Sequence, residues 1–278
     1  MRLSIQETSL GPRTFHDTWH LAQQASLEGI NLCYGCKTEI VSLNNVDYPI
    51  QIDDMARRHG VAVSGMHLGY LSQVPFLVGE ASSREEGKRI VRRALEIAGR
   101  IGAPVVIVPL DGPNSIRDSQ HQEAAVACLQ ELAEDAGEAG VSIAVEGPMG
   151  YDHVRDLLTS VDRPQVKFCY DTGDAAAARH DAIGMIRNLG ADRIAQVHLK
   201  DVNLSAQPPD FSVRLGHGDV CFDAVMFALR SVMYDGWVVL ETPPGDEDGQ
   251  IVALHVEDAR SILARGRDVE SPGGPAAS

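Results

Sequence analysis

Residues 194–201 read Ile-Ala-Gln-Val-His-Leu-Lys-Asp, a mostly apolar run that stops at His198 and is followed by charged residues. Three other short runs rich in valine, alanine or aromatic residues stop in the same way, at Glu146, Asp171 and Glu241. Runs that are apolar at successive positions are typical of parallel strands covered on both faces. We therefore predict a parallel sheet whose last four strands each end in a residue that can bind a metal ion.

Eight such runs alternate with longer helical patterns along the chain. The expected strands are Leu3–Glu7, Gly29–Cys33, Ala62–Met66, Val105–Pro109, Ser142–Glu146, Lys167–Asp171, Ile194–His198 and Trp237–Glu241. Eight strands with helices between them fit one closed (β/α)₈ TIM barrel with a parallel core. An open doubly wound sheet is the main competitor, but it favours a glycine-rich phosphate loop after the first strand. Residues 8–12, Thr-Ser-Leu-Gly-Pro, contain no such loop.

The clearest helical patterns are Arg84–Ile101, with an apolar stripe, and His121–Ala139. A glycine follows each of them, and a glycine after the last helical residue is a common helix end. The sequence shows no linker before residues 271–278, Ser-Pro-Gly-Gly-Pro-Ala-Ala-Ser. We therefore expect one barrel domain over residues 1–268 and a disordered tail over 269–278.

Composition excludes several classes of partner. The formal net charge is −15, which disfavours nucleic acid and anionic membrane surfaces, because both require a basic face. No apolar run approaches the roughly 18 residues of a membrane span. The cysteines number five, an odd count, and no signal peptide precedes the first run, so we expect reduced thiols and a cytoplasmic location. The lone CxxC of Cys33 and Cys36 is interpreted as packing rather than as a zinc or redox site.

The residues at the strand ends suggest a metal site. In a parallel barrel the carboxyl ends of the strands carry the active residues. Three carboxylates and one imidazole suit one divalent ion, Mn²⁺ in the first place, with Mg²⁺, Co²⁺ or Fe²⁺ as alternatives and Zn²⁺ less favoured. The competing interpretation is that each residue separately caps a loop or forms an ion pair.

The second half of the chain also resembles the xylose-isomerase-like TIM-barrel superfamily, the group of sugar phosphate isomerases and epimerases that includes inosose isomerases and ketose 3-epimerases. The matching segments, in the order of that family, are residues 145–147 (Val-Glu-Gly), 170–173 (Tyr-Asp-Thr-Gly), 197–201 (Val-His-Leu-Lys-Asp), 214–220 (Arg-Leu-Gly-His-Gly-Asp-Val) and 240–242 (Leu-Glu-Thr). The resemblance implies that Glu146, Asp171, His198 and Glu241 hold the metal, and that Glu146 and Glu241 also exchange protons with substrate carbon. Homo-oligomers are common among such relatives.

The resemblance leads to a hypothesis and its alternatives. The expected activity is a metal-dependent isomerase or epimerase that converts a small, unphosphorylated sugar or keto-polyol through an enediolate. A lyase on the same fold, either an inosose-type dehydratase or an enzyme that β-eliminates a keto-glycoside, begins with the same enolisation. A non-catalytic binding barrel and an apurinic endonuclease are less favoured, the latter because of the negative charge.

Five further residues are candidates for substrate binding: His67, Asp174, Lys200, Arg214 and Glu7. Many relatives carry histidine where this chain has Asp174, and a carboxylate there would accept hydrogen bonds from sugar hydroxyls and repel a phosphate. The alternative for Asp174 is a helix N-cap. The alternatives for Arg214 and His67 are a surface ion pair and a loop histidine.

Overall fold

The computed structural model describes residues 1–265, so the predicted domain end at 268 and the predicted tail lie outside the described residues. Eight parallel strands form a closed barrel in which each strand pairs with the next and β8 returns to β1. This confirms the predicted (β/α)₈ architecture. The strands are β1 (Arg2–Gln6), β2 (Gly29–Cys33), β3 (Ala62–His67), β4 (Val105–Pro109), β5 (Ser142–Glu146), β6 (Val166–Asp171), β7 (Ile194–Leu199) and β8 (Trp237–Leu240).

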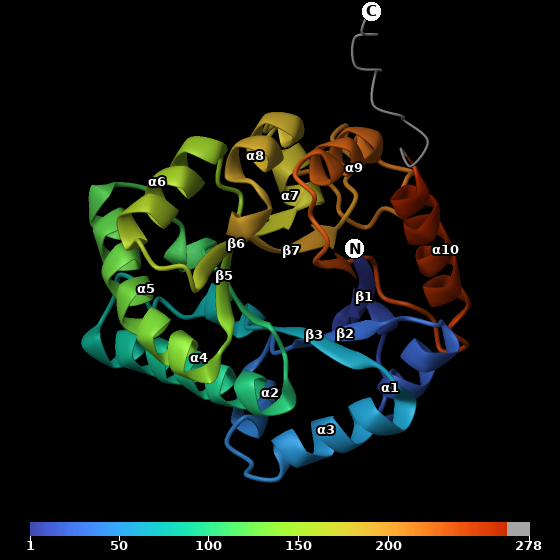
Figure 1. Cartoon of the computed structure of the whole chain (residues 1–278), viewed down its shortest axis with the longest axis horizontal. Helices are drawn as coiled ribbons and strands as arrows, with labels where there is room; N and C mark the ends of the chain where they lie inside the picture. Colours follow the sequence, from blue (N-terminus) through green and yellow to red (C-terminus); the bar gives the residue numbers. More distant parts are fainter. Residues whose placement is uncertain (266–278) are drawn as a thin grey trace, which may run out of the picture.

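At least one α-helix follows every strand, and the helices surround the ring of strands (Figure 1). The α-helices are α1 (Phe15–Gln24), α2 (Lys37–Ser42), α3 (Tyr48–His59), α4 (Ala81–Ile101), α5 (Ser119–Ala139), α6 (Tyr151–Val161), α7 (Thr172–Ala177), α8 (Ala182–Leu189), α9 (Phe222–Ser231) and α10 (Gln250–Ala264). Four short 3₁₀ turns are η1 (Glu7–Leu10), η2 (Gly69–Gln73), η3 (Gly112–Asn114) and η4 (Ala191–Arg193).

The observed element ends differ from the predicted ends by a few residues. Glu7 begins the 3₁₀ turn η1 rather than ending β1, and Glu241 is the first residue after β8. The two clearest helices begin earlier than predicted. Helix α4 begins at Ala81. Helix α5 begins at Ser119, because the side chain of Asp118 accepts a hydrogen bond from the backbone N–H of His121 in its first turn. Both helices end at a left-handed glycine, Gly102 and Gly140, as predicted.

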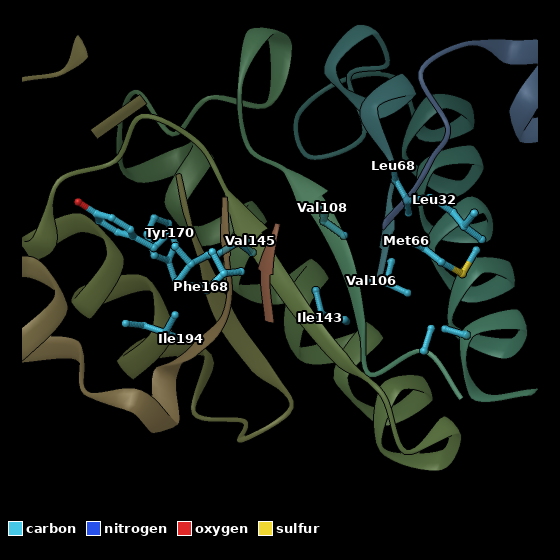
Figure 2. Close-up of a cluster of buried hydrophobic side chains, with 14 of the residues drawn as sticks. Leu32, Met66, Leu68, Val106, Val108, Ile143, Val145, Phe168, Tyr170 and Ile194 are labelled. Atoms are coloured by element: carbon cyan, nitrogen blue, oxygen red, sulfur yellow. The ribbon is translucent and has the colours of Figure 1, made fainter. Parts of the chain in front are cut away.

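Side chains on successive strand positions point to opposite sides of the barrel wall. On the outer side, Val106, Val108, Ile143 and Val145 pack in one large core with residues of the surrounding helices (Figure 2). Burial of each such side chain contributes about 1.5–3 kcal/mol, so this layer supplies most of the force that holds the helices on the barrel. A second, small cluster consists of alternate residues on three adjacent strands, and we place it inside the barrel: Val105, Ile107, Ala144 and Cys169.

One buried asparagine joins the loops that follow β3 and β4. The Nδ2 atom of Asn114 donates to the backbone carbonyls of Leu71 and Val74, at 2.7 and 2.9 Å. Its Oδ1 atom accepts from the backbone of Phe76 and Leu77, at 3.0 and 3.3 Å. Because all its hydrogen-bonding capacity is used inside the protein, Asn114 orders the rim on this side of the barrel.

Candidate metal centre

The barrel brings the four predicted ligands together at the carboxyl ends of adjacent strands. Glu146 ends β5, Asp171 ends β6, His198 lies in β7, and Glu241 directly follows β8. One ligand atom from each of the four lies within 4.8 Å of the others. We call these four residues the quartet. Three members are buried and Glu241 is partly exposed, so the group opens to solvent on one side.

His198 stands at the centre of the quartet and is fully buried. Its Nδ1 atom lies 2.8 Å from Oε1 of Glu146 and 2.8 Å from Oε2 of Glu241. The same ring nitrogen therefore faces both carboxylates, which come from strands that are not neighbours in the barrel.

Asp171 has a structural role as well as a place in the quartet. Its Oδ1 atom accepts a hydrogen bond of 2.7 Å from the backbone N–H of Asp174, so Asp171 is the N-cap of α7. The expected alternative for Asp174, that it caps this helix itself, is therefore wrong. Asp174 lies in the first turn, where its backbone is capped by Asp171 and its side chain is left for other contacts. The other Asp171 oxygen, Oδ2, is buried without a hydrogen-bond partner among residues 1–265.

The charges of the quartet are only partly balanced by its neighbours. Burial raises the pKa of Asp171 well above its ordinary value, and the carboxylates of Asp174 and Glu241 raise it further against the opposing charge of Lys200. Burial alone would also raise the pKa of Glu241, but the hydrogen bond with His198 and the charge of Lys200 lower that pKa to about 2. Asp171 is thus the carboxylate for which the surrounding protein supplies too little positive charge.

Lys200 joins three acidic side chains at the open side of the quartet. Its Nζ atom donates to Oε1 of Glu241 at 2.7 Å and lies 3.7 Å from Oδ2 of Asp171 and 3.6 Å from Oδ1 of Asp174. The ammonium also lies 5.1 Å from the ring centroid of Phe211. Two of the predicted substrate-binding residues, Lys200 and Asp174, are therefore next to the quartet and next to each other.

His67 also reaches the quartet. Its Nε2 atom is 3.0 Å from Oε2 of Glu146, the oxygen that does not face His198. Its Nδ1 atom lies 3.5 Å from Nε2 of Gln6. Burial lowers the pKa of His67, but contacts with Cys33 and Glu146 outweigh burial and raise that pKa to about 10.

Two predicted binding residues have their principal contacts elsewhere. Oε2 of Glu7 accepts a 3.0 Å hydrogen bond from the backbone of Cys33, and Glu7 lines a separate cavity of about 220 Å³ beside Tyr48. Arg214 forms two hydrogen bonds to the carboxylate of Asp258 on α10. The guanidinium is thereby neutralised on the outer helical layer, so the structure favours the ion-pair alternative for Arg214 over substrate binding.

Asp201 organises the loop between β7 and α9. Its buried carboxylate accepts four backbone N–H groups at 2.9 to 3.1 Å, those of Val202, Gly216, Gly218 and Val220. The loop from Val202 to Val220 is therefore tied to the end of the strand that carries His198.

The sequence prediction missed the polar residues beneath the quartet. Cys169 lies two positions before Asp171, and its Sγ atom is 3.4 Å from Oε1 of Glu146. Gln196 lies two positions before His198, and its Oε1 atom is 3.1 Å from Nε2 of that ring. The two-residue period of a strand places each on the same face as its ligand, so this spacing was the signal that could have identified them.

Comparison with known proteins agrees with this fold. The family model described as "Xylose isomerase-like TIM barrel" matches residues 19–268. The chain is 26% identical to an inosose dehydratase of Lacticaseibacillus casei over 132 residues, 41% of this chain but only 44% of the dehydratase. It is 25% identical to a 2-epi-5-epi-valiolone 7-phosphate 2-epimerase of an Actinoplanes species over 253 residues, 90% of each chain. The crystal structure of an IolI protein with a bound zinc atom has a similar fold, with a TM-score of 0.75, 16% identity, and coverage of 94% of this chain and 96% of the other.

Proposed function

The chain belongs to the xylose isomerase-like TIM-barrel family, and from that premise we propose that it is a divalent-metal-dependent isomerase or epimerase of a small, unphosphorylated sugar or keto-polyol. The observation that carries the proposal is the quartet, whose four ligand atoms, from four strand ends, lie within 4.8 Å of one another. Enzyme relatives with epimerase and dehydratase names support the general class of reaction.

The quartet fits a divalent ion by its chemistry. Oδ2 of Asp171 is buried beside other carboxylates without a hydrogen-bond partner in residues 1–265, and the Lys200 ammonium at 3.7 Å does not offset its burial. A bound cation would supply the missing positive charge. Glu146, Asp171, His198 and Glu241 would hold the ion. When bound, it would polarise a substrate carbonyl or hydroxyl and acidify the carbon beside it. Mn²⁺ remains our proposed ion, and Zn²⁺ is an alternative because of the zinc in the IolI structure.

Glu146 and Glu241 are suited to move protons on opposite sides of a substrate. They stand on β5 and next to β8, two strands that are separated in the ring by β6 and β7. Each has its own partner, because Glu146 contacts His67 at 3.0 Å and Glu241 contacts Lys200 at 2.7 Å. One carboxylate would remove the proton to give the enediolate, and the other would return it to the opposite face.

Lys200 and Asp174 are the groups that we assign to the substrate hydroxyls. They are adjacent and partly exposed at the open side of the quartet. Within the described chain, Lys200 is the only cation that contacts all three of Glu241, Asp171 and Asp174. These three carboxylates already neutralise its positive charge. A phosphate there would be repelled, which favours an unphosphorylated substrate, although the Actinoplanes relative is named for a phosphate ester.

A lyase is the second candidate. It is favoured by the match to an inosose dehydratase. This candidate uses the same enolisation and differs only in what happens to the anion.

The test is a proton-exchange experiment with metal-loaded protein. The protein is stripped with a chelator, reloaded with Mn²⁺, and incubated in D₂O with ketohexoses, inososes and 3-keto-glycosides while NMR follows the products. Deuterium at one carbon of an intact skeleton is expected, whereas loss of water or of an aglycone would indicate the lyase. Glu146→Gln should lower both metal content and exchange. Metal content and exchange that are both independent of Glu146 would refute the proposal.

The binding partner, the oligomeric state and the cellular location of the protein are also proposals. A small sugar or polyol is the expected partner, assembly into a homo-oligomer is expected from the resemblance, and a cytoplasmic location stays a prediction. Among the described residues, no helix combines the length and the apolar character needed to cross a bilayer.

A further inference from the structure

Besides the small apolar cluster, the inside of the barrel below the quartet holds a group of polar side chains, where barrels of this kind usually carry branched apolar ones. Ser4, Asn31, Ser64 and Gln196 all have no solvent exposure there. They come from four strands and are linked by hydrogen bonds, including a 2.6 Å contact between the hydroxyls of Ser4 and Ser64. Buried polar groups are retained at a cost in free energy, so this group requires an explanation.

The orientation of the Gln196 amide is set by a group that can only accept. Nε2 of Gln196 donates a hydrogen bond of 3.0 Å to the backbone carbonyl of Ser64. Rotating the amide by 180° would bring two oxygens together at that distance. The Oε1 atom of Gln196 must therefore point the other way, where Nδ2 of Asn31 donates to it at 2.7 Å.

This orientation determines what His198 can do. Nε2 of His198 lies 3.1 Å from Oε1 of Gln196, and an oxygen acceptor at that distance requires a proton on Nε2. The lone pair of the neutral ring then belongs to Nδ1, the nitrogen that faces Glu146 and Glu241 at 2.8 Å. We infer that Gln196 is a positioning residue that, oriented by the carbonyl of Ser64, makes Nδ1 of His198 the ligand nitrogen.

A competing arrangement is defined by Asn31. Its Nδ2 atom lies 3.4 Å from Nε2 of His198 and could donate to an unprotonated Nε2. That tautomer would place the Nε2 lone pair against the lone pairs of Gln196 Oε1 at 3.1 Å, and its hydrogen bond from Asn31 would be the longer of the two. The geometry therefore favours the proton on Nε2.

The inference rests on the proposed metal site, and the experiment separates the two. First, protein with ¹⁵N-labelled histidine is loaded with the diamagnetic ion Zn²⁺, and its imidazole nitrogens are assigned by NMR. We expect one histidine with its proton on Nε2 and with an Nδ1 resonance shifted by the metal. Both of these nitrogen resonances should be missing from the spectrum of His198→Gln. Two results would overturn the proposed function: a wild-type protein that binds no divalent ion, or an Asp171→Asn variant that binds the ion as tightly as the wild type does. A bound ion with the proton of His198 on Nδ1 would overturn this inference alone.

The second arm measures affinity for Mn²⁺ alone. Gln196→Met keeps the length of the side chain but removes the acceptor, and loss of an outer partner of a metal-binding histidine typically weakens metal affinity 10- to 100-fold. Asn31→Leu is the matched control, because it removes a buried amide from the same network and leaves Oε1 of Gln196 for His198. We expect a higher Kd for Gln196→Met than for the wild type, and a Kd within about threefold of wild type for Asn31→Leu. Equal losses in both variants, or no loss in Gln196→Met, would contradict a positioning role, and the NMR arm decides the matter if either variant does not fold.

Discussion

The stem of Lys200 packs directly against the backbone of Gly173. A Cβ atom at position 173 would lie 2.9 Å from Cγ of Lys200 and 3.1 Å from its Cβ and Cδ. The backbone of Gly173 does not adopt a left-handed conformation, so space rather than conformational freedom requires glycine here. The contact allows Lys200 to reach Oε1 of Glu241 at 2.7 Å.

Gly173→Ala is therefore expected to displace Lys200. Overpacking of this kind costs about 1–3 kcal/mol of unfolding free energy, and turnover should fall because the ammonium leaves Glu241. Urea denaturation and steady-state kinetics measure the two effects. Gly35→Ala is the control, since the nearest atom to its added Cβ, on Glu39, is 3.8 Å away. A Gly173→Ala protein with wild-type stability and turnover would show that the contact is unimportant.

Metal should stabilise the fold measurably. The quartet exists only in the folded barrel, so a divalent ion at 100 times its Kd adds about 2.7 kcal/mol. For a chain of this size each kcal/mol raises Tm by about 2–4 °C, which predicts a rise of about 5–10 °C. Calorimetry with and without chelator measures the rise, and Asp171→Asn should reduce it. An unchanged Tm in saturating Mn²⁺ would count against a site at the quartet.

Asp174→Asn should separate substrate binding from metal binding. The side chain of Asp174 caps no helix and, within residues 1–265, its charged contact is Lys200 at 3.6 Å. The Kd for Mn²⁺ should stay within a few-fold of wild type. KM should rise about 10- to 100-fold, the value of a hydrogen bond to a charged group. Kinetics and metal titration on the same preparation decide, and a normal KM would remove Asp174 from the substrate site.

Asp201→Asn should loosen the loop after β7 without changing the quartet. The substitution replaces one carboxylate oxygen by an NH₂ group, which can only donate. Depending on the amide orientation, it would face the N–H groups of Gly216 and Gly218 or those of Val202 and Val220. Two backbone donors would then lose their acceptor, at a cost of at least about 2 kcal/mol. Faster proteolysis within residues 202–220 and a lower Tm are expected, with Mn²⁺ affinity retained. The control is Asp219→Asn, which affects one exposed hydrogen bond to Leu204. Equal stability losses in the two variants would contradict the special role of Asp201.

Arg214→Ala tests a residue for which the sequence left two interpretations open. Since the guanidinium is bound to Asp258, KM should change by less than about twofold. Stability should fall only slightly, because the ion pair is open to solvent. Asp258→Ala should have the same effect, and the double variant should add little to either. A rise in KM of tenfold or more in Arg214→Ala would restore its predicted place in the substrate site.

The barrel and the quartet could be predicted from the sequence because both depend on local pattern. Continuous apolarity marks a strand covered on both faces, and parallel strands in a barrel all end at the same rim. The last residues of four apolar runs, Glu146, Asp171, His198 and Glu241, therefore had to converge. The helix ends at Gly102 and Gly140 were equally local, since the left-handed residue after a helix favours glycine.

The tertiary structure decided which groups pair once the strands had closed. Arg214 meets Asp258, 44 positions later, and Lys200 passes Gly173 in the first turn of α7. The N-cap of α7 is Asp171 rather than Asp174, and the orientation of Gln196 follows from a carbonyl 132 positions earlier in the chain. Sequence spacing specifies which face of a strand a side chain takes. It does not specify which of several donors and acceptors that side chain meets, because that depends on barrel register and on side-chain packing between distant segments.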